Sequence, residues 1–235
     1  MNRTFMLILT FLVPCTLFSV NAKNVGGFIT ERNKRISVKT PAKIVHSKLA
    51  CTALCLQNSG CCFANYNLLT KECILGNRRC HDNTESATGW LFLKRGTNYK
   101  NKVFFYFENT LDWYDAQSYC KRFGMRLATI SNTDEDQFVK SLTKRSNGVW
   151  LGGSDMPNEG DWHWNKPNLP LVFTNWGRSA LIKQPDNIFN QDCLTYWRCD
   201  PLETNYQWAD ASCGSSFYFI CERIVRVDSE TWPIE

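Results

Sequence analysis

The chain has 235 residues, of which 43% are hydrophobic and 21% are charged, so it can form one large folded domain or two small ones. Its charge is divided unevenly: residues 23–95 carry a net charge of +8, and residues 96–235 carry −4. The acidic second half disfavours nucleic acid as a partner and is compatible with divalent cations, whereas the basic first half suits anionic glycans or membrane surfaces.

The first 22 residues have the pattern of a secretory signal peptide. Arg3 gives a positive start, residues 5–18 form an apolar run, and small residues up to Ala22 suit cleavage. The apolar run is too short to span a bilayer, and no later stretch is long enough to do so. The sequence therefore predicts a secreted, extracellular protein without a transmembrane segment.

Cysteine usage agrees with export. Eleven cysteines follow residue 22, in two groups: 51, 55, 61, 62, 73 and 80, then 120, 193, 199, 213 and 221. Zinc binding is the competing explanation, but the chain has no Cys-x-x-Cys pair and only three histidines. We therefore expect disulfides.

Residues 23–96 are predicted to form a small disulfide-rich module, closed by a strand at 91–93 and followed by a short linker at 94–98. Cys51 and Cys55 are four residues apart, so on a helix both face the same adjoining strand or hairpin. The segment resembles the PAN/apple module, in which a short helix is stapled to a hairpin. That resemblance implies the pairs Cys51–Cys73, Cys55–Cys61 and Cys62–Cys80, and the sequence leaves open that Cys61 and Cys62 exchange partners.

Residues 97–225 are predicted to form a mixed α and β domain, followed by a tail at 226–235. A strand at 103–107 precedes a helix that starts at Asn109-Thr110 and ends at Gly124, and a second helix follows Ser131-Asn132-Thr133. Residues 149–151 are expected to form a buried strand. The stretch 155–192 is rich in Pro, Asn, Asp and Trp and has little periodicity, which is typical of a long functional loop.

Several motifs follow one another between Cys120 and Cys221. They are Trp150-Leu151-Gly152-Gly153, Gln184-Pro185-Asp186, Cys193, Trp208-Ala209-Asp210 and Cys213. With these motifs the chain resembles a C-type lectin domain, an α+β fold with two helices, antiparallel sheets and a long loop region. The resemblance implies the disulfides Cys120–Cys221 and Cys193–Cys213, and a loop-built surface that binds sugars with the help of calcium.

The resemblance also implies a carbohydrate and calcium site at Gln184, Asp186, Gln191 and Asp210. Phe189 is the favoured aromatic platform for a sugar ring, and Trp176 is the other candidate. The family more often has an acid at the position of Gln191 and an asparagine at Ala209. Because calcium affinity follows ligand number and charge, we expect weak ion binding at this site. In the family, Gln-Pro-Asp goes with galactose-type ligands.

A second calcium site is implied by the spacing Asp-x-x-x-Glu-Gly at Asp155 and Glu159, together with Asn187 and Asp192. If these three carboxylates and the amide converge, the negative charges repel one another, and a bound cation would remove that repulsion. The alternative is that these are ordinary solvated loop residues.

Cys199 has no partner in this scheme. An odd cysteine in an exported chain predicts an interchain disulfide and hence a homodimer, with an unpaired buried thiol as the alternative. Enzyme chemistry is not expected, because the chain lacks a nucleophile elbow, a His-Glu-x-x-His motif and a phosphate-binding glycine loop.

Two main functions follow from the sequence. The first is a secreted lectin for galactose-type glycans or glycoproteins. The second is a secreted protein-interaction module of the same fold that needs neither calcium nor sugar, a role that Gln191 and Ala209 favour. A third hypothesis is binding of anionic glycans through the basic residues Arg32, Lys34, Arg35 and Lys39.

Overall fold

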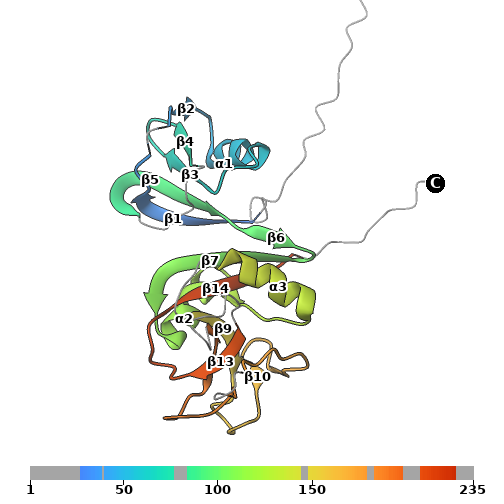
Figure 1. Cartoon of the computed structure of the whole chain (residues 1–235). Helices are drawn as coiled ribbons and strands as arrows, with labels where there is room; N and C mark the ends of the chain where they lie inside the picture. Colours follow the sequence, from blue (N-terminus) through green and yellow to red (C-terminus); the bar gives the residue numbers. More distant parts are fainter. Residues whose placement is uncertain are drawn as a thin grey trace, which may run out of the picture.

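The computed structural model describes residues 27–38, 40–76, 84–143, 148–178, 183–197 and 207–225. The predicted signal peptide, Lys39, Cys80, Cys199 and the predicted tail lie outside these residues. Figure 1 shows two bodies, each built around its own sheet. Among the described helices, none has the length and apolar character needed to cross a membrane.

The first body is a five-stranded antiparallel sheet with one helix on it. Its elements are β1 (Phe28–Arg35), β2 (Lys43–Ile44), α1 (Lys48–Gln57), β3 (Phe63–Asn67), β4 (Glu72–Gly76) and β5 (Glu85–Arg95), and the strand order is β1-β5-β3-β4-β2. Ser47 caps α1, since its hydroxyl oxygen accepts a hydrogen bond from the Ala50 amide. Leu91 and Leu93 belong to the buried cluster that also contains the half-cystines of α1.

Disulfides join α1 to its surroundings. Cys51 is bonded to Cys73 on β4, and Cys55 is bonded to Cys61 in the turn before β3. Cys62 is also disulfide-bonded, and its expected partner Cys80 lies outside the described residues. Such a thin module has little apolar core of its own, so these bridges supply much of its stability.

The segment expected to be a linker belongs almost entirely to two strands instead. β5 runs to Arg95 and β6 begins at Thr97, with only Gly96 between them. Lys94 is 8% exposed, and its ammonium donates to the Tyr106 carbonyl at 2.6 Å. A Cβ at Gly96 would lie 2.5 Å from Val103, so only glycine permits this close approach. The linker prediction was wrong because the charged, turn-like composition of the segment indicated an exposed loop, whereas Lys94 is buried in a strand.

The two bodies share contacts along this junction. Ile29 of β1 is 2% exposed and belongs to the same buried cluster as Phe105 and Phe107 of the second body. The Tyr119 hydroxyl donates to the Glu31 carboxylate at 3.0 Å. β1 of the first sheet therefore packs against the second body.

The second body combines two helices with a nine-stranded sheet. Its elements are β6 (Thr97–Tyr99), β7 (Lys102–Leu111), α2 (Trp113–Arg122), β8 (Arg126–Leu127), α3 (Thr133–Leu142), β9 (Val149–Ser154), β10 (His163–Trp164), β11 (Leu169–Pro170), β12 (Cys193–Trp197), β13 (Gln207–Ala211) and β14 (Phe217–Ile224). The main strand order is β11-β10-β9-β14-β7-β6, and β12 pairs with β9 and β13.

Two sequence expectations need correction here. β14 and β9 pair in parallel, so the sheet is mixed rather than purely antiparallel. The helix expected at Asn109-Thr110 begins later, because β7 continues to Leu111, which pairs with Phe217. The Asp112 carboxylate then caps α2 by accepting from the Asp115 amide at 2.8 Å. Ladder pairing outweighs the capping propensity of Asn109 and Thr110.

Candidate functional site

Buried tryptophans position the strand that leads into the site. The Trp113 indole donates to the Leu151 carbonyl at 2.9 Å, and the Trp150 indole donates to the Leu111 carbonyl at 3.0 Å. A Cβ at Gly152 would lie 2.9 Å from the Leu127 carbonyl oxygen, which explains a glycine at this point of β9. Asp155 directly follows this rigid strand.

Two disulfides fasten the same region. Cys120 of α2 is bonded to Cys221 of β14, and Cys193 at the start of β12 is bonded to Cys213 after β13. The second bridge closes the base of the β12–β13 hairpin. It therefore holds Asp192, which precedes the hairpin, and Asp210, which is near its end, on one framework.

The buried carboxylate of Asp136 anchors the long loop to α3. Its Oδ1 accepts from the Tyr196 hydroxyl at 2.8 Å and from the Trp208 indole at 2.9 Å, and its Oδ2 accepts from the Asn175 amide at 2.7 Å. Lys140 pairs with the same Oδ2 at 2.6 Å. Burial and the nearby Asp136 charge raise the pKa of Tyr196 well above its ordinary value, so the tyrosine is a neutral donor.

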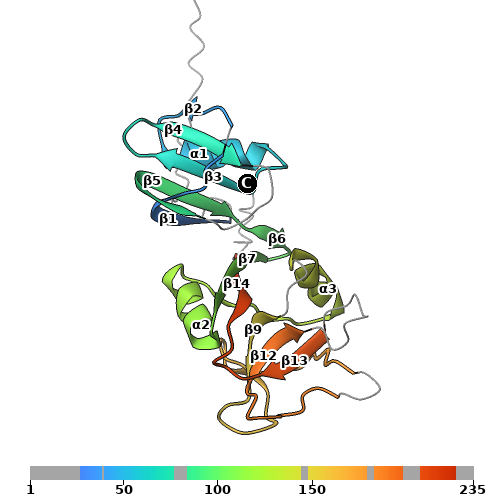
Figure 2. The same ribbon diagram turned by 60° about the vertical axis from the view of Figure 1, so that its left-hand side comes forward.

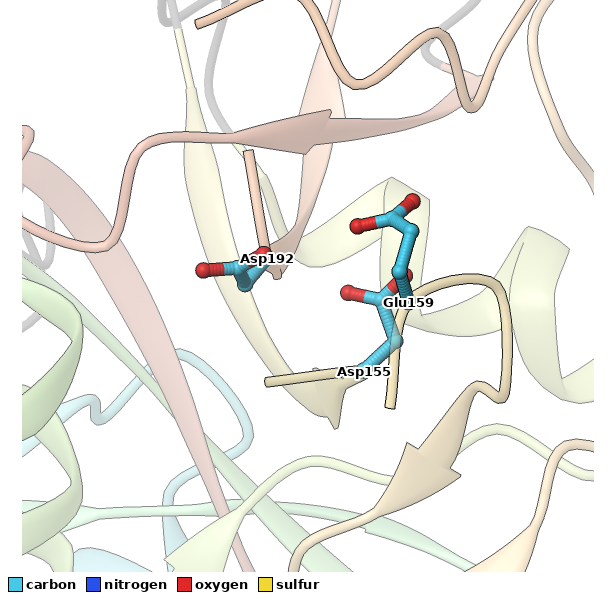
Figure 3. A group of neighbouring side chains, drawn as sticks. All are labelled: Asp155, Glu159 and Asp192. Carbon is cyan, nitrogen blue, oxygen red and sulfur yellow. The ribbon is translucent and has the colours of Figure 1, made fainter. Parts of the chain in front are cut away.

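Three carboxylates converge next to the loop base. Oxygens of Asp155, Glu159 and Asp192 lie within 4.8 Å of one another, and Figure 3 shows the three side chains grouped at one point. Asp155 is 1% exposed, and its Oδ2 accepts from the Gly160 amide at 2.9 Å. Its buried Oδ1 has no hydrogen-bond partner among the described residues. An unsatisfied buried carboxylate oxygen within an acidic cluster fits a hard cation such as calcium.

The electrostatics of this cluster point the same way. Burial raises the pKa of Asp155, and the charges of Asp192 and Asp210 raise it further. Desolvation and the charges of Asp155, Asp192 and Asp210 raise the pKa of the exposed Glu159. Asp210 therefore belongs to the electrostatic neighbourhood of both expected sites, a coupling that sequence spacing did not reveal.

These raised pKa values predict how stability depends on pH in a calcium chelator. A carboxyl whose pKa is higher in the folded than in the unfolded chain contributes stability below its unfolded value of 3.8, and this contribution is lost as pH rises through the folded pKa. We expect the free energy of unfolding to fall more between about pH 4 and pH 7 in the parent chain than in Asp155→Asn. Denaturant unfolding at several pH values measures this, and parallel curves would contradict it.

The Gln184-Pro185-Asp186 loop is held to β13 by hydrogen bonds. The Gln184–Pro185 peptide is cis. Gln184 donates from Nε2 to Asp186 Oδ2 at 2.8 Å and accepts through Oε1 from the Asp210 amide at 3.2 Å. Asp210 is 4% exposed and accepts from the amides of Asp186 and Asn187, the latter at 2.6 Å. The structure thus brings Gln184, Asp186 and Asp210 together.

The remaining expected ligands are placed less favourably for an ion. When the side-chain carboxamide of Gln191 is oriented to satisfy its oxygen and its nitrogen, Nε2 donates to Asp186 Oδ1 at 3.0 Å. The Gln191 backbone amide donates to Asn187 Oδ1 at 2.9 Å. Ala209 is 3% exposed on β13 and offers no side-chain oxygen. The loop oxygens therefore already accept protein hydrogen bonds, whereas Asp155 in the acidic cluster has an oxygen to spare.

Asp210, on β13 beside this loop, also has a raised pKa. Burial raises its pKa, although hydrogen bonds from the backbone amides of Asn187 and Asp186 oppose the shift. A bound cation would favour the charged form of the same carboxylate. Ion binding and proton binding at Asp210 are therefore expected to compete.

The tip of the loop is strained and exposes an aromatic ring. Asn187, Phe189 and Asn190 all have left-handed backbones, with φ of 48°, 65° and 62°. Phenylalanine seldom adopts this conformation, and such strain clusters at ligand sites. Phe189 is 92% exposed. Trp176, the other platform candidate, packs edge-on against Trp162 with ring centroids 4.9 Å apart, so it serves the loop core.

Comparisons with known proteins identify the family of the second body. A family model described as the Lectin C-type domain matches residues 109–223. The chain is 28% identical to perlucin-like protein of Mytilus galloprovincialis over 63% of this chain and 89% of that one. It is 30% identical to C-type lectin 16 of Aedes aegypti, over 51% of this chain and 80% of that one.

A third relative is longer. The chain is 26% identical to CD209 antigen-like protein D of Mus musculus over 59% of this chain, and it spans about half of that protein's length, 52%. The match therefore reaches only part of that protein.

Proposed function

The chain belongs to the C-type lectin domain family, and from this premise we propose that it is a secreted lectin that binds galactose-type glycans with the help of calcium. The observation that carries the proposal is the convergence of Gln184, Asp186 and Asp210 beside an acidic cluster and an exposed ring, Phe189. Sugar hydroxyls need such paired donors and acceptors, and the ring suits the apolar face of a sugar.

Calcium is assigned first to Asp155, Glu159 and Asp192. These residues fit the ion because their oxygens converge and one buried oxygen of Asp155 is unsatisfied. A bound ion would neutralise the repulsion and stiffen the loop. At Gln184, Asp186 and Asp210 the side-chain oxygens already accept amide protons, and the Gln191 amide donates to Asp186, so ion binding there is expected to be weaker.

Galactose preference is inferred from Gln-Pro-Asp. In the C-type lectin family this order of amide and acid goes with galactose-type ligands, and the reverse order goes with mannose-type ones. In this chain the Gln184 amide and the Asp186 carboxylate are hydrogen-bonded to each other, so donor and acceptor are held side by side. Exchanging them in Gln184→Glu/Asp186→Asn would exchange the donors and acceptors offered to the sugar.

The rest of the chain fits an exported protein. The N-terminal pattern supports secretion, and the name of one relative, salivary C-type lectin 1 of Aedes albopictus, is consistent with it. We also infer that residues 23–96 form a PAN/apple-like module, since α1 is stapled by Cys51–Cys73 and Cys55–Cys61. A dimer through Cys199 would raise avidity, and a non-reducing gel that shows only monomer would exclude it.

A glycan array with calcium and with chelator tests the lectin proposal. We expect binding to galactosides in calcium and loss of most binding in chelator. In calcium, Asp210→Asn should weaken galactoside binding about tenfold, because the amides of Asp186 and Asn187 lose their charged acceptor. Asp161→Asn, a change of an exposed acid in the same domain, is the control.

The second candidate function is protein binding without calcium or sugar. Ala209 and the internally bonded oxygens of the loop favour it, since both reduce the ligands available to an ion. Absence of glycan binding in both buffers would reject the lectin and leave this alternative.

A further inference from the structure

Three exposed aliphatic residues lie at one end of the first sheet. Leu69 is 84% exposed, Ile44 is 69% exposed and Leu68 is 45% exposed. Ile44 pairs with Glu72 across β2 and β4, and the Val45 amide donates to the Lys71 carbonyl at 3.0 Å. Leu68 and Leu69 lie in the β3–β4 turn just before Lys71, so the three residues lie at the same end of the sheet. We call Ile44, Leu68 and Leu69 the apolar tip.

The turn that carries the leucines is well fixed. The Asn67 carboxamide oxygen accepts from the amides of Leu69 and Thr70 at 2.8 and 3.0 Å. The Leu68 amide donates to the Gly89 carbonyl on β5 at 2.9 Å, and the Lys71 ammonium donates to the Leu68 carbonyl at 2.7 Å. The leucines are thus held out to solvent by an ordered backbone, which lowers the entropy lost on binding.

Basic residues adjoin the apolar tip, where the one acid among the paired residues is Glu72 opposite Ile44. Lys43, Lys48, Lys71 and Arg32 are exposed, and none forms an ion pair with a described residue. Lys43 and Lys71 adjoin Ile44 and the leucine turn directly, while Arg32 precedes Asn33, whose side chain accepts from the Gly89 amide. The basic residues of 23–95 outnumber the acidic ones by twelve to four.

The strands that adjoin the tip lie on the far side of the first body. In Figures 1 and 2, β2 and β4 lie on the side of the first body opposite the second. The surface is therefore accessible while the loop around Gln184 and Asp210 is engaged elsewhere on the molecule.

We propose that the apolar tip and its cations dock the protein on an anionic phospholipid surface. Leu68, Leu69 and Ile44 enter the boundary between headgroups and acyl chains, and Lys43, Lys48, Lys71 and Arg32 meet the lipid phosphates and carboxylates. A sulfated polysaccharide would satisfy the cations but offers no apolar phase for three exposed aliphatic side chains. The combination of both features therefore selects a membrane.

Vesicle sedimentation tests the proposal with the full chain. The probes are phosphatidylcholine vesicles with and without about 30% phosphatidylserine, in about 100 mM salt and a calcium chelator. We expect binding to the anionic vesicles and at least tenfold weaker binding to the neutral ones. Leu68→Ser/Leu69→Ser should weaken anionic binding at least tenfold, and Lys43→Gln/Lys48→Gln should weaken it and reduce its salt dependence.

The matched control is Leu169→Ser/Val172→Ser, which removes two exposed aliphatic residues from the second domain and should leave vesicle binding unchanged. Leu69→Ser alone changes one highly exposed side chain and provides a second folded variant, checked by its melting temperature. No binding to anionic vesicles, or an unchanged affinity in the leucine variants, would overturn the proposal. So would tight heparin binding combined with no vesicle binding, which would assign the cations to a glycan. Because sugar and calcium are absent, the result is independent of the proposed lectin function.

Discussion

Asp136→Ala is expected to lower the free energy of unfolding by about 3 to 5 kcal/mol. The substitution removes the acceptor of the Tyr196 hydroxyl, the Trp208 indole and the Asn175 amide, and it leaves Lys140 without its partner. Each buried donor left unsatisfied adds its own desolvation penalty. For a chain of this size the melting temperature should fall by roughly 10 °C. Denaturant and thermal unfolding would measure both effects.

Asp134→Ala is the matched control, because Asp134 is exposed in the first turn of the same helix. It should cost no more than about 1 kcal/mol, the usual effect of a charge near a helix terminus. Asp136→Asn keeps one carbonyl acceptor and should fall between the two. If Asp136→Ala and Asp134→Ala were equally mild, the anchoring role of Asp136 would be refuted.

Asp155→Asn is expected to act in opposite directions in two buffers. In calcium at about one hundred times the dissociation constant, the ion should stabilise the parent chain by about 2.7 kcal/mol, and the variant should lose most of this gain. In chelator the variant should be more stable than the parent, because burial and the charges of Asp192 and Asp210 disfavour the charged Asp155. Thermal melts with calcium and with chelator, supported by calorimetric titration, measure both signs.

Asp161→Asn serves as the control for calcium as well, since Asp161 is exposed and outside the acidic cluster. It should keep the calcium-induced shift in full. A parent chain whose melting temperature does not respond to calcium would exclude the assigned ion site, and it would favour the calcium-independent alternative.

Local patterns in the sequence were sufficient for much of the fold. The second helix begins after Asn132, as its capping residues predict, because the Asn132 side chain accepts from the Glu135 amide at 3.0 Å. Val149–Leu151 lies within a fully buried strand, and the expected irregular stretch contains only two short strands among its described residues. These features depend on neighbours in sequence, so they can be read there.

Other features depended on contacts between distant segments. β7 extends through the expected helix start at Asn109 because it pairs with β14. That partner strand lies more than a hundred residues later, so the sequence around Asn109 does not reveal the pairing. Lys94 is buried because Tyr106 supplies an acceptor across the junction of the two bodies. Burial of an acid or a lysine cannot be inferred from composition, since these residues are exposed in most proteins.

The candidate site divides in the same way. The expected ligands came from the resemblance of the motifs to the C-type lectin family, but which oxygens are available is a property of the folded loop. The side chain of Asn187, expected in the second calcium site, accepts from the Gln191 amide, and Asp210 couples electrostatically to Asp155 and Glu159. Asp136, the anchor of the long loop, has no motif that would identify it, because its three hydrogen-bonding partners come from the loop and the β12–β13 hairpin.

By itself, the order of cysteines, tryptophans and the Gln-Pro-Asp triplet determined the family, and it predicted the region where a ligand would bind. The order and spacing of these residues reflect the helices, strands and loops that carry them, and both can be read directly from the sequence. Only the tertiary structure decided which carboxylates share one point, which oxygens are already bonded and which apolar side chains face water. Desolvation and charge repulsion act through space over a few ångströms, and they depend on distances that the order of residues does not contain.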